Sequence, residues 1–96
     1  MLDDAFEWDA SKAHSNLIKH GVSFVAASCV FDDLFASEEL DETSEPSEAR
    51  YIITGMVNGV MLTVVYTERD GRTRIISARK ATRHEQRNYY RNQTSE

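Results

Sequence analysis

The sequence contains little cysteine, proline or glycine, and it has no long apolar run. Its 96 residues include one cysteine (Cys29), one proline and four glycines. One cysteine cannot form a disulfide within the chain, which excludes a small secreted scaffold held together by disulfide bonds. No stretch approaches the ~20 apolar residues that a membrane-spanning helix needs. The N-terminal segment MLDDAFEWDA lacks the basic and apolar regions of a signal peptide, so we expect a cytoplasmic protein without a membrane partner.

The motifs of several enzyme classes are also missing. The sequence has no glycine-rich phosphate loop, no Gly-x-Ser-x-Gly element and no paired cysteines. Glu7, Asp9 and His14 lie near one another in the sequence, but they match no recognised metal-ligand pattern. We therefore expect neither a metal nor another cofactor.

The composition indicates one small folded domain covering residues 1–96. Apolar residues make up 41% of the chain and charged residues 28%, which is an ordinary balance for a globular protein. A chain of this length forms a single domain, and its core must be small.

Local patterns in the N-terminal half predict one strand and two helices. Residues 6–9 alternate between apolar and acidic side chains, as a short strand does. Asp9 or Ser11 can cap a helix that ends at about His20, before Gly21. Ser23 can cap a second helix with apolar residues at helical spacing. Residues 32–48 are acidic and have few apolar anchors, so we expect an acidic surface connection there.

The C-terminal half predicts three strands and a last helix. Strands are expected over 51–57, 60–67 and 73–79, because Asn58-Gly59 and Asp70-Gly71 are strong turn signals between β-rich runs. Thr82 and Glu85 have the spacing of a capping box before a polar helix at about 82–93. The whole chain then reads β-α-α-β-β-β-α, an α+β fold in which an antiparallel sheet is packed with helices.

Charge is distributed unevenly along the chain. The net charge is −5, but residues 1–48 carry −10 and residues 49–96 carry +5. The acidic total argues against a nucleic-acid partner, whereas eight arginines and one lysine in the second half favour a phosphate-binding face. An acidic segment on the far side of the domain would be largely screened from that face, because the Debye length is about 8 Å at physiological salt. A solvated basic surface without a ligand is the alternative interpretation.

Several basic residues stand at positions that suit phosphate chemistry. Arg69 and Arg79 end two predicted strands, and simple alternation puts Arg79 on one strand face with Ile75 and Ser77. Lys19 and His20 close the first helix, where their charge also fits a purely structural interaction with the helix C-terminus. Arg83, Arg87 and Arg91 form an i, i+4, i+8 row that favours a solvated helix face.

Several segments in the same order resemble one family, the BrnT toxins. In the N-terminal half these are Phe6-Glu-Trp-Asp9, Asn16, Lys19-His-Gly-Val-Ser-Phe24, Ala27 and Val30-Phe-Asp-Asp33. In the C-terminal half they are Glu48-x-Arg50, Gly55, Val64-Val-Tyr-Thr-Glu-Arg69, Arg74-Ile-Ile-Ser-Ala-Arg-Lys-Ala81, Glu85 and Tyr89 or Tyr90. The resemblance runs from Phe6 to about Tyr90 and leaves out only residues 36–47.

The resemblance implies a ribonuclease toxin of a type II toxin–antitoxin pair, with a RelE-like fold. It implies an RNA substrate and a BrnA-type antitoxin that dimerises through a ribbon-helix-helix domain and joins the toxin in a hetero-oligomer. Operator DNA would be bound through the antitoxin, with the toxin as transcriptional co-repressor. The alternative is a non-enzymatic nucleic-acid-binding or antitoxin-binding module, an inactive relic of a toxin, because an arginine-rich sheet suits binding as well as cleavage.

If the chain cleaves RNA without a metal, the 2′-hydroxyl attacks the adjacent phosphorus, and fixed cations stabilise the charge that develops on phosphate oxygens. We expect Arg79 and Arg69 to do this. Lys19 or His20 can assist proton transfer if the first helix packs its C-terminus toward the sheet. The remaining candidates are expected to bind RNA: Arg50, Arg74, Lys80 and Arg83.

Overall fold

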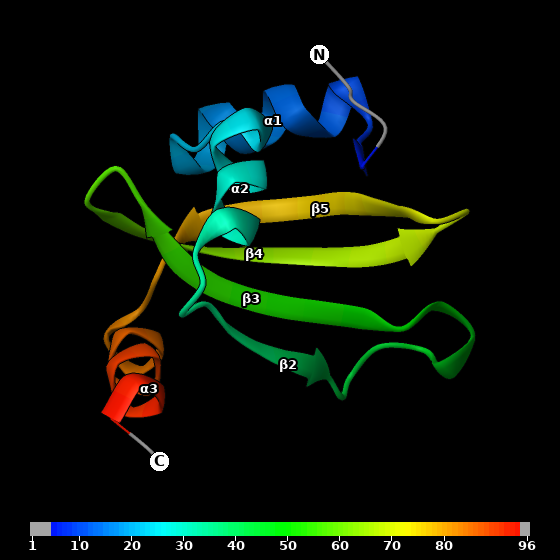
Figure 1. Ribbon diagram of the computed structural model, residues 1–96. Coiled ribbons are helices and arrows are strands. Elements are labelled where there is room, and N and C mark those ends of the chain that lie inside the picture. Colours follow the sequence, from blue (N-terminus) through cyan, green and yellow to red (C-terminus); the bar gives the residue numbers. More distant parts are fainter. Residues whose placement is uncertain (1–4, 95–96) are drawn as a thin grey trace.

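Five strands form one sheet with the order β1-β5-β4-β3-β2 in the computed structural model, which describes residues 5–94 (Figure 1). In chain order the elements are β1 (Phe6–Glu7), α1 (Ala10–His20), α2 (Phe24–Ser28), the 3-10 turn η1 (Cys29–Asp32), β2 (Ser37–Asp41), the 3-10 turn η2 (Pro46–Glu48), β3 (Arg50–Val57), β4 (Val60–Arg69), β5 (Arg72–Lys80) and α3 (Arg83–Thr94). The α+β fold expected from the sequence is confirmed. Within residues 5–94, no helix has the length and apolar character that crossing a bilayer requires.

Capping side chains set the helix starts where the sequence predicts them. The carboxylate of Asp9 accepts the Lys12 N–H at 3.0 Å at the start of α1, and the Ser23 hydroxyl accepts the Ala26 N–H at 3.0 Å at the start of α2. Gly21, with φ +70°, ends α1 in the left-handed conformation that glycine adopts without strain. These contacts confirm both predicted helices, although the second is short and continues as η1.

The two predicted hairpins also form, and they set the sheet register. Asn58 and Gly59 have φ of 50° and 83°, and Asp70 and Gly71 have φ of 54° and 78°. Two consecutive positive φ angles are typical of the type I′ turn, whose twist matches that of the strands it joins. β3, β4 and β5 therefore run antiparallel as a continuous meander.

One expectation about the sheet is wrong, and the expected antiparallel sheet is confirmed for three of its four strand pairings among residues 5–94. The acidic connection at 32–48 contains a strand, since β2 (Ser37–Asp41) pairs antiparallel with β3. Edge strands are often charged and are stabilised by pairing with a neighbour, so their sequence carries little apolar alternation. The sheet is also not purely antiparallel, because β1 pairs with β5 in parallel. That pairing is possible because α1 and the later strands separate β1 from β5 in the chain.

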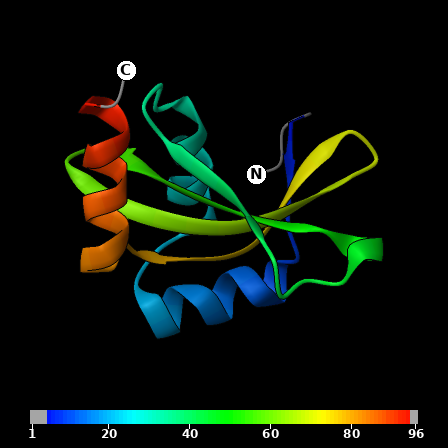
Figure 2. The ribbon, with the colours of Figure 1, turned by 90° about the horizontal axis from the view of Figure 1, so that it is seen from below.

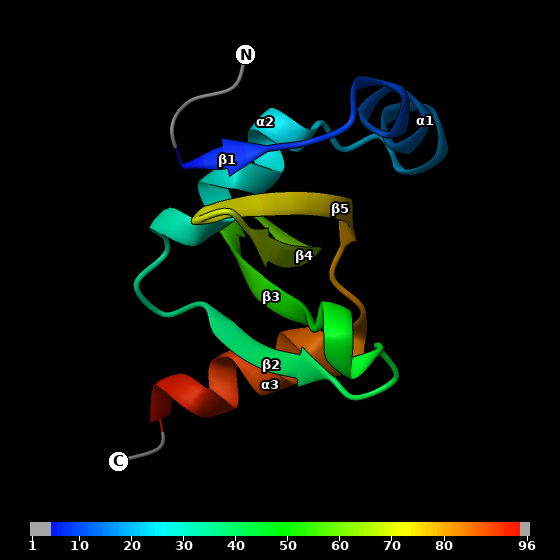
Figure 3. The ribbon, with the colours of Figure 1, turned by 90° about the vertical axis from the view of Figure 1, so that its right-hand side faces the viewer.

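One face of the sheet, which we call the α1/α2 face, is apolar and covered by helices. Phe24, Ala27 and Val30 from α2 and η1 pack against Val64 and Ile75, and all five side chains are at most 2% exposed. Figure 3 shows α1 and α2 near β5 and α3 near β2, toward the other edge of the sheet. The layer beneath α1 and α2 is the hydrophobic core of the domain.

Asn16 joins α1 to the outer edge of β5. Its side-chain amide donates to the carbonyls of Val22 and Ala78 at 3.0 and 2.8 Å, and its carbonyl oxygen accepts the Ala78 N–H at 3.1 Å. The side chain thus bonds the Ala78 peptide edge as a neighbouring strand would, beyond the point where the two-residue β1 ends. Asn16 is 7% exposed, so losing these bonds would leave buried polar groups unpaired.

The opposite side, which we call the α3 face, is polar and only partly covered. Seen from below, α3 crosses one end of the strands, and no helix of residues 5–94 lies over the other end (Figure 2). Thr54 and Thr63 are buried beneath α3, with exposures of 5% and 1%. We call the part near α3 the α3 end and the uncovered part, at the β4–β5 turn, the open end.

Candidate functional site

The register of the sheet places five arginines on the α3 face. Thr63 and Thr67 of β4 point to this face, because they alternate with the core residues Val64 and Tyr66. Arginines pair with these threonines or with each other across the strands: Arg50 and Arg74 with Thr67, Arg79 with Thr63, and Arg69 with Arg72. Paired residues point to the same face of a sheet, so all five guanidinium groups share one side.

A β-bulge in β5 makes this arrangement possible and corrects the expected alternation. Val65 pairs with Ser77 and Tyr66 with Ile75, so Ile76 is an extra residue in β5. Ile75 therefore lies in the core, on the face opposite Arg79, and not beside it as simple alternation predicted. Without the bulge, Arg74 and Arg79 would lie on opposite faces, because five positions separate them.

At the α3 end, Arg79 forms a two-pronged ion pair with Glu85 of α3. Its Nη1 and Nη2 donate to the two carboxylate oxygens at 2.8 and 2.9 Å. The same carboxylate accepts the Thr63 hydroxyl at 2.9 Å and the Thr82 N–H at 2.8 Å. The Thr82 hydroxyl accepts the Glu85 N–H at 3.2 Å, which completes the predicted capping box. Glu85 thus connects β4, β5 and the start of α3.

This network keeps both partners ionised. Hydrogen bonds from Arg79, Thr82 and Thr63 outweigh burial and lower the pKa of Glu85 to about 2, while the bond to Glu85 raises the pKa of Arg79. A carboxylate with so low a pKa is a poor general base at neutral pH. Arg79 has five N–H groups and makes three hydrogen bonds, the third to the Lys80 carbonyl at 3.4 Å. Two N–H groups remain for a phosphate.

At the open end, the other four arginines share two carboxylates. Arg69 and Arg50 lie 3.3 and 3.9 Å from Glu48, and Arg74 and Arg72 lie 3.1 and 3.8 Å from Glu7. The side chains of Arg50, Arg69, Arg72 and Glu48 are 43 to 50% exposed. Exposed ion pairs contribute only about 0–1 kcal/mol, so a phosphate can compete with Glu48 more easily than with Glu85, whose side chain is 18% exposed.

The structure does not bring Arg69 and Arg79 together. Arg69 pairs with Arg72, and seven residues of β5 separate Arg72 from Arg79, which is about 20 Å along a strand. The two arginines cannot contact the same phosphate group. Arg69, Arg50 and Arg74 instead form one basic area at the open end, at a distance from Arg79.

His20 lies at the Arg79 end of β5, but on the α1 side of this strand, whereas the Arg79 side chain points to the α3 face. Four residues, or about 6 Å of helix, separate it from Asn16, which bonds to the β5 edge at Ala78. Lys80 lies two residues, or about 7 Å, beyond Ala78. Since α1 and β5 run side by side in the same direction (Figure 1), His20 is level with this end of β5. His20 is half-buried on the Asn16 side of α1, whereas Lys19 is exposed.

The two remaining candidates lie beside this end rather than on the α3 face. Lys80 pairs with Leu62, a core residue, so the register directs it away from Arg79 although the two are neighbours in sequence. Arg83 is the first residue of α3 and is exposed.

The sequence did not show that carboxylates neutralise part of the basic face. It indicated Glu85 as a capping residue and as part of the family resemblance, and the spacing across the strand-to-helix connection carries no recognisable signal for its ion pair with Arg79. The expectation that acidic groups lie far from the arginines is also wrong. Asp41 pairs directly with Arg50, and Glu39 lies on the α3 face two residues before it.

A second anchor of α3 was also not predicted. The Tyr89 hydroxyl donates to Asp33 at 2.6 Å, and the same carboxylate oxygen accepts the Met56 N–H at 2.8 Å. Burial and the bond to Asp33 raise the pKa of Tyr89 to about 12, and these bonds lower the pKa of Asp33 despite its partial burial. A Cβ on Gly55 would lie 3.2 Å from this carboxylate, so glycine lets the Asp33 loop approach β3. The anchor holds the middle of α3 on the sheet.

Comparison with known protein families gives a match that covers most of the chain. A family model described as "Ribonuclease toxin, BrnT, of type II toxin-antitoxin system" matches residues 8–85. The matched region includes α1, α2, the strands β2 to β5, Arg79, His20 and Glu85, and it begins directly after β1. No curated protein matches the chain. Within residues 5–94, no group of three or more His, Cys, Asp or Glu side chains is placed to hold a metal ion.

Proposed function

The chain belongs to the BrnT family of ribonuclease toxins of type II toxin–antitoxin systems, and we propose that it is an active, metal-independent endoribonuclease that binds RNA on the α3 face. The observation that carries this proposal is the register that places five arginines on that face. Family membership implies an RNA substrate and a cognate antitoxin. The remaining steps of the proposal assign roles to particular residues.

The four arginines of the open end bind the RNA backbone. Their carboxylate partners Glu7 and Glu48 are each shared by two arginines, so these ion pairs leave part of the arginine charge unneutralised at close range. A phosphate neutralises this remaining charge and releases counterions, which makes binding salt-dependent. The acidic strand β2 borders the area and directs RNA along β3, β4 and β5 by repulsion. Arg50, Arg69 and Arg74 are thus RNA-binding residues in this proposal.

Cleavage takes place at the α3 end of β5. The 2′-oxygen forms a bond to phosphorus as the bond from phosphorus to the 5′-oxygen breaks, leaving a cyclic phosphate and a free 5′-hydroxyl. The two remaining N–H groups of Arg79 donate to phosphate oxygens as their negative charge grows. His20, on the other side of β5, approaches this phosphate around the end of the strand and removes the 2′-hydroxyl proton or supplies the proton to the 5′-oxygen. Lys19, exposed beside it, adds positive charge near the phosphate.

Glu85 orients the Arg79 guanidinium and also reduces its attraction for RNA. The ion pair holds the guanidinium in one orientation, which lowers the cost of arranging it in the transition state. The carboxylate also cancels most of its charge at a distance, so the Arg79–Glu85 pair attracts RNA less than a free arginine does. Arg79 therefore contributes through hydrogen bonds at close range, and attraction of RNA depends on the open end.

The antitoxin is of the BrnA type in this proposal, and it acts with the toxin as a transcriptional co-repressor. The acidic residues of β2 and its flanks, which include Glu38 and Glu42, contact basic antitoxin residues. Neutralising these acids should weaken antitoxin binding more at low salt than at high salt, because salt screens exposed charges. If the variant with neutralised acids binds the antitoxin as tightly as the unmodified protein does, these acidic residues do not contact the antitoxin.

Induced expression in a bacterial host tests the enzymatic function. We expect growth arrest with RNA degradation, both lost in Arg79→Ala and both reversed by co-expression of the antitoxin. The alternative is a non-enzymatic module that binds nucleic acid or antitoxin, and one observation favours it: every sheet arginine on the α3 face has a carboxylate within 4 Å. Intact RNA in arrested or growing cells, together with stable antitoxin binding, would support that alternative.

A further inference from the structure

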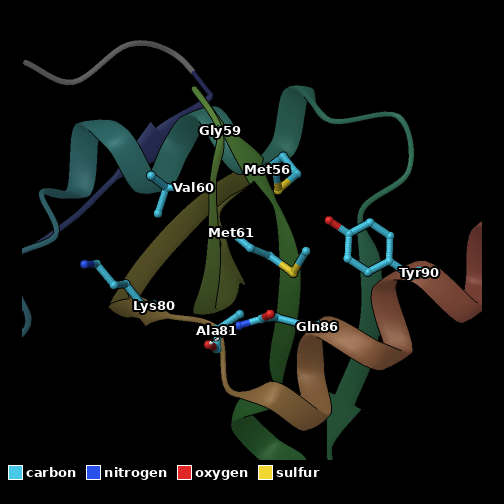
Figure 4. Close-up of a pocket in the computed structure, with 8 residues that line it drawn as sticks. All are labelled: Met56, Gly59, Val60, Met61, Lys80, Ala81, Gln86 and Tyr90. Carbon is cyan, nitrogen blue, oxygen red and sulfur yellow. Dashed lines mark hydrogen bonds between the residues drawn. The ribbon is translucent and has the colours of Figure 1, made fainter.

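A cleft of about 360 Å³ opens beside the proposed cleavage site, between the end of the sheet and α3 (Figure 4). Met56 of β3 and Met61 of β4 form its apolar floor, Lys80 lines it at the end of β5, and Gln86 and Tyr90 line it from α3. We propose that this cleft is a nucleobase subsite, which holds the base of the nucleotide adjoining the phosphate at Arg79. The inference rests on the proposed ribonuclease function and adds base recognition to it.

Tyr90 supplies a stacking surface. Its side chain is 53% exposed, which is high for a large aromatic residue, and its ring borders the cleft opposite Lys80 (Figure 4). The ring is held in place by an edge-to-face contact with Tyr89, with centroids 5.3 Å apart and planes at 83°. Tyr89 is in turn buried and bonded to Asp33. Single-stranded RNA is commonly bound by stacking its bases on such exposed aromatic rings.

The methionines suit a base that stacks on Tyr90. Figure 4 shows Met56 and Met61 beside the ring, with the Met61 thioether between Tyr90 and Lys80. Thioethers are polarisable and make favourable contacts with aromatic rings, and methionine adapts its shape to different partners. A planar base can therefore lie between the Tyr90 ring and the two thioethers.

Gln86 and Lys80 add polar recognition. The Gln86 side-chain N–H donates to the Ala81 carbonyl at 3.3 Å, which orients the amide at the cleft wall. An amide has two N–H donors and a carbonyl acceptor, so Gln86 retains a donor and an acceptor for the edge of a base. Lys80 borders the other side of the cleft, where its amine, directed away from Tyr90, adds positive charge at the rim (Figure 4). The cleft thus has one aromatic ring for stacking, one amide for hydrogen bonds and one positive charge at its rim.

The cleft is close enough to Arg79 to hold the neighbouring nucleotide. Arg79 Nη1 lies 3.4 Å from the carbonyl oxygen of Lys80, whose side chain lines the cleft. Gln86 directly follows Glu85, the ion-pair partner of Arg79. A phosphate at the Arg79 guanidinium thus leaves its attached base within reach of Tyr90 and Gln86.

Methionine methyl NMR tests the subsite directly, because two of the three methionines line the cleft. The probes are short 2′-O-methyl RNA homopolymers of A, G, C and U, which cannot be cleaved because the attacking hydroxyl is blocked. We expect saturable ring-current shifts of the Met56 and Met61 methyl signals, assigned with Met→Leu variants, and unequal affinities for the four bases. Unmoved methyl signals with all four probes would overturn the subsite.

Three variants separate stacking from a general effect on RNA binding. Tyr90→Ala should bind the preferred probe about tenfold more weakly, which is typical for the loss of one base–aromatic stack. Tyr90→Phe keeps the ring and should stay within about twofold of the unmodified protein. Phe35→Ala is the matched control, because Phe35 is an aromatic residue that is 60% exposed outside the cleft. Equal losses in Tyr90→Ala and Phe35→Ala would contradict base stacking at Tyr90.

Cleavage specificity distinguishes failure of the subsite from failure of the ribonuclease. On a mixed-sequence RNA, Gln86→Ala should reduce the nucleotide preference at one position beside the cut, while cleavage continues. If RNA is cleaved and that preference is unchanged in both Gln86→Ala and Tyr90→Ala, the subsite is wrong and the ribonuclease stands. If the methyl signals respond but no RNA is cleaved, the subsite stands and the ribonuclease proposal fails.

Discussion

The two faces of the sheet are built in opposite ways. The α1/α2 face is closed by apolar side chains such as Phe24 and Val30, which are 2% exposed or less. The α3 face is held to its helix by polar contacts, the Arg79–Glu85 ion pair and the Tyr89–Asp33 hydrogen bond, and its far end carries exposed arginines. Apolar burial contributes far more to stability than exposed ion pairs do. One face therefore stabilises the fold, and the other is available for the RNA binding that we propose.

The largest expected effect is a loss of stability on the α1/α2 face. Phe24→Ala removes the largest fully buried side chain and should lower the free energy of unfolding by about 3–5 kcal/mol. Val25→Ala is the matched control, since Val25 is the next residue of α2 and is 56% exposed. Its change should stay within about 0.5 kcal/mol. Urea denaturation measures both, and similar losses in the two variants would contradict the assignment of the core to this face.

The next largest expected effect is a lower rate of RNA cleavage when a residue of the α3 face is changed. Arg79→Ala should reduce the rate of RNA cleavage by about 10²–10³-fold, as the loss of one transition-state donor does in other enzymes. His20→Ala should cost less, because we expect charge stabilisation and substrate positioning to dominate. Cleavage rates are compared after circular dichroism has shown that both variants are folded. A larger loss in His20→Ala than in Arg79→Ala would reverse the assigned roles.

A smaller effect is the pH dependence of stability contributed by Glu85. Its pKa is about 2 in the folded protein, below the value near 4.5 of the free side chain, so its stabilising effect is complete above about pH 4.5 and is lost as the pH falls toward 2. Glu85→Gln should lower Tm at pH 7, and the difference from the unmodified protein should shrink between pH 5 and 3. Thermal melts at these pH values test this. A difference in Tm that does not change with pH would show that Glu85 stabilises α3 without its charge.

The contrast between the faces also explains what the sequence could predict. The helices and hairpins follow from local signals, namely caps at Asp9 and Ser23 and turns at Asn58-Gly59 and Asp70-Gly71. Strand β2 was missed because an edge strand needs little apolar alternation when β3 supplies its hydrogen bonds. The parallel pairing of β1 depends on contacts between the two ends of the chain, which local patterns do not encode.

The candidate site was predictable in its residue types but not in its arrangement. Eight arginines in one half of the sequence indicated a basic face, and Arg79 and His20 were selected by their positions at the end of a strand and the end of a helix; both lie at the same end of β5. The bulge at Ile76 decides which arginines share a face, and nothing in the local sequence reveals it. The carboxylates of Glu7, Glu48 and Glu85 reach the arginines only through tertiary pairing.

The most direct measurement of RNA binding on the α3 face is the salt dependence of affinity for a non-cleavable 2′-O-methyl RNA. The double variant Arg69→Ala with Arg72→Ala should reduce the slope of log affinity against log salt concentration by about 1.4, since each contact to single-stranded RNA contributes about 0.7. Lys12→Ala is the control, because it removes an exposed charge from α1. Its slope should remain that of the unmodified protein. An unchanged slope in the double variant, or an equal reduction in Lys12→Ala, would show that RNA does not bind to the arginines of the α3 face.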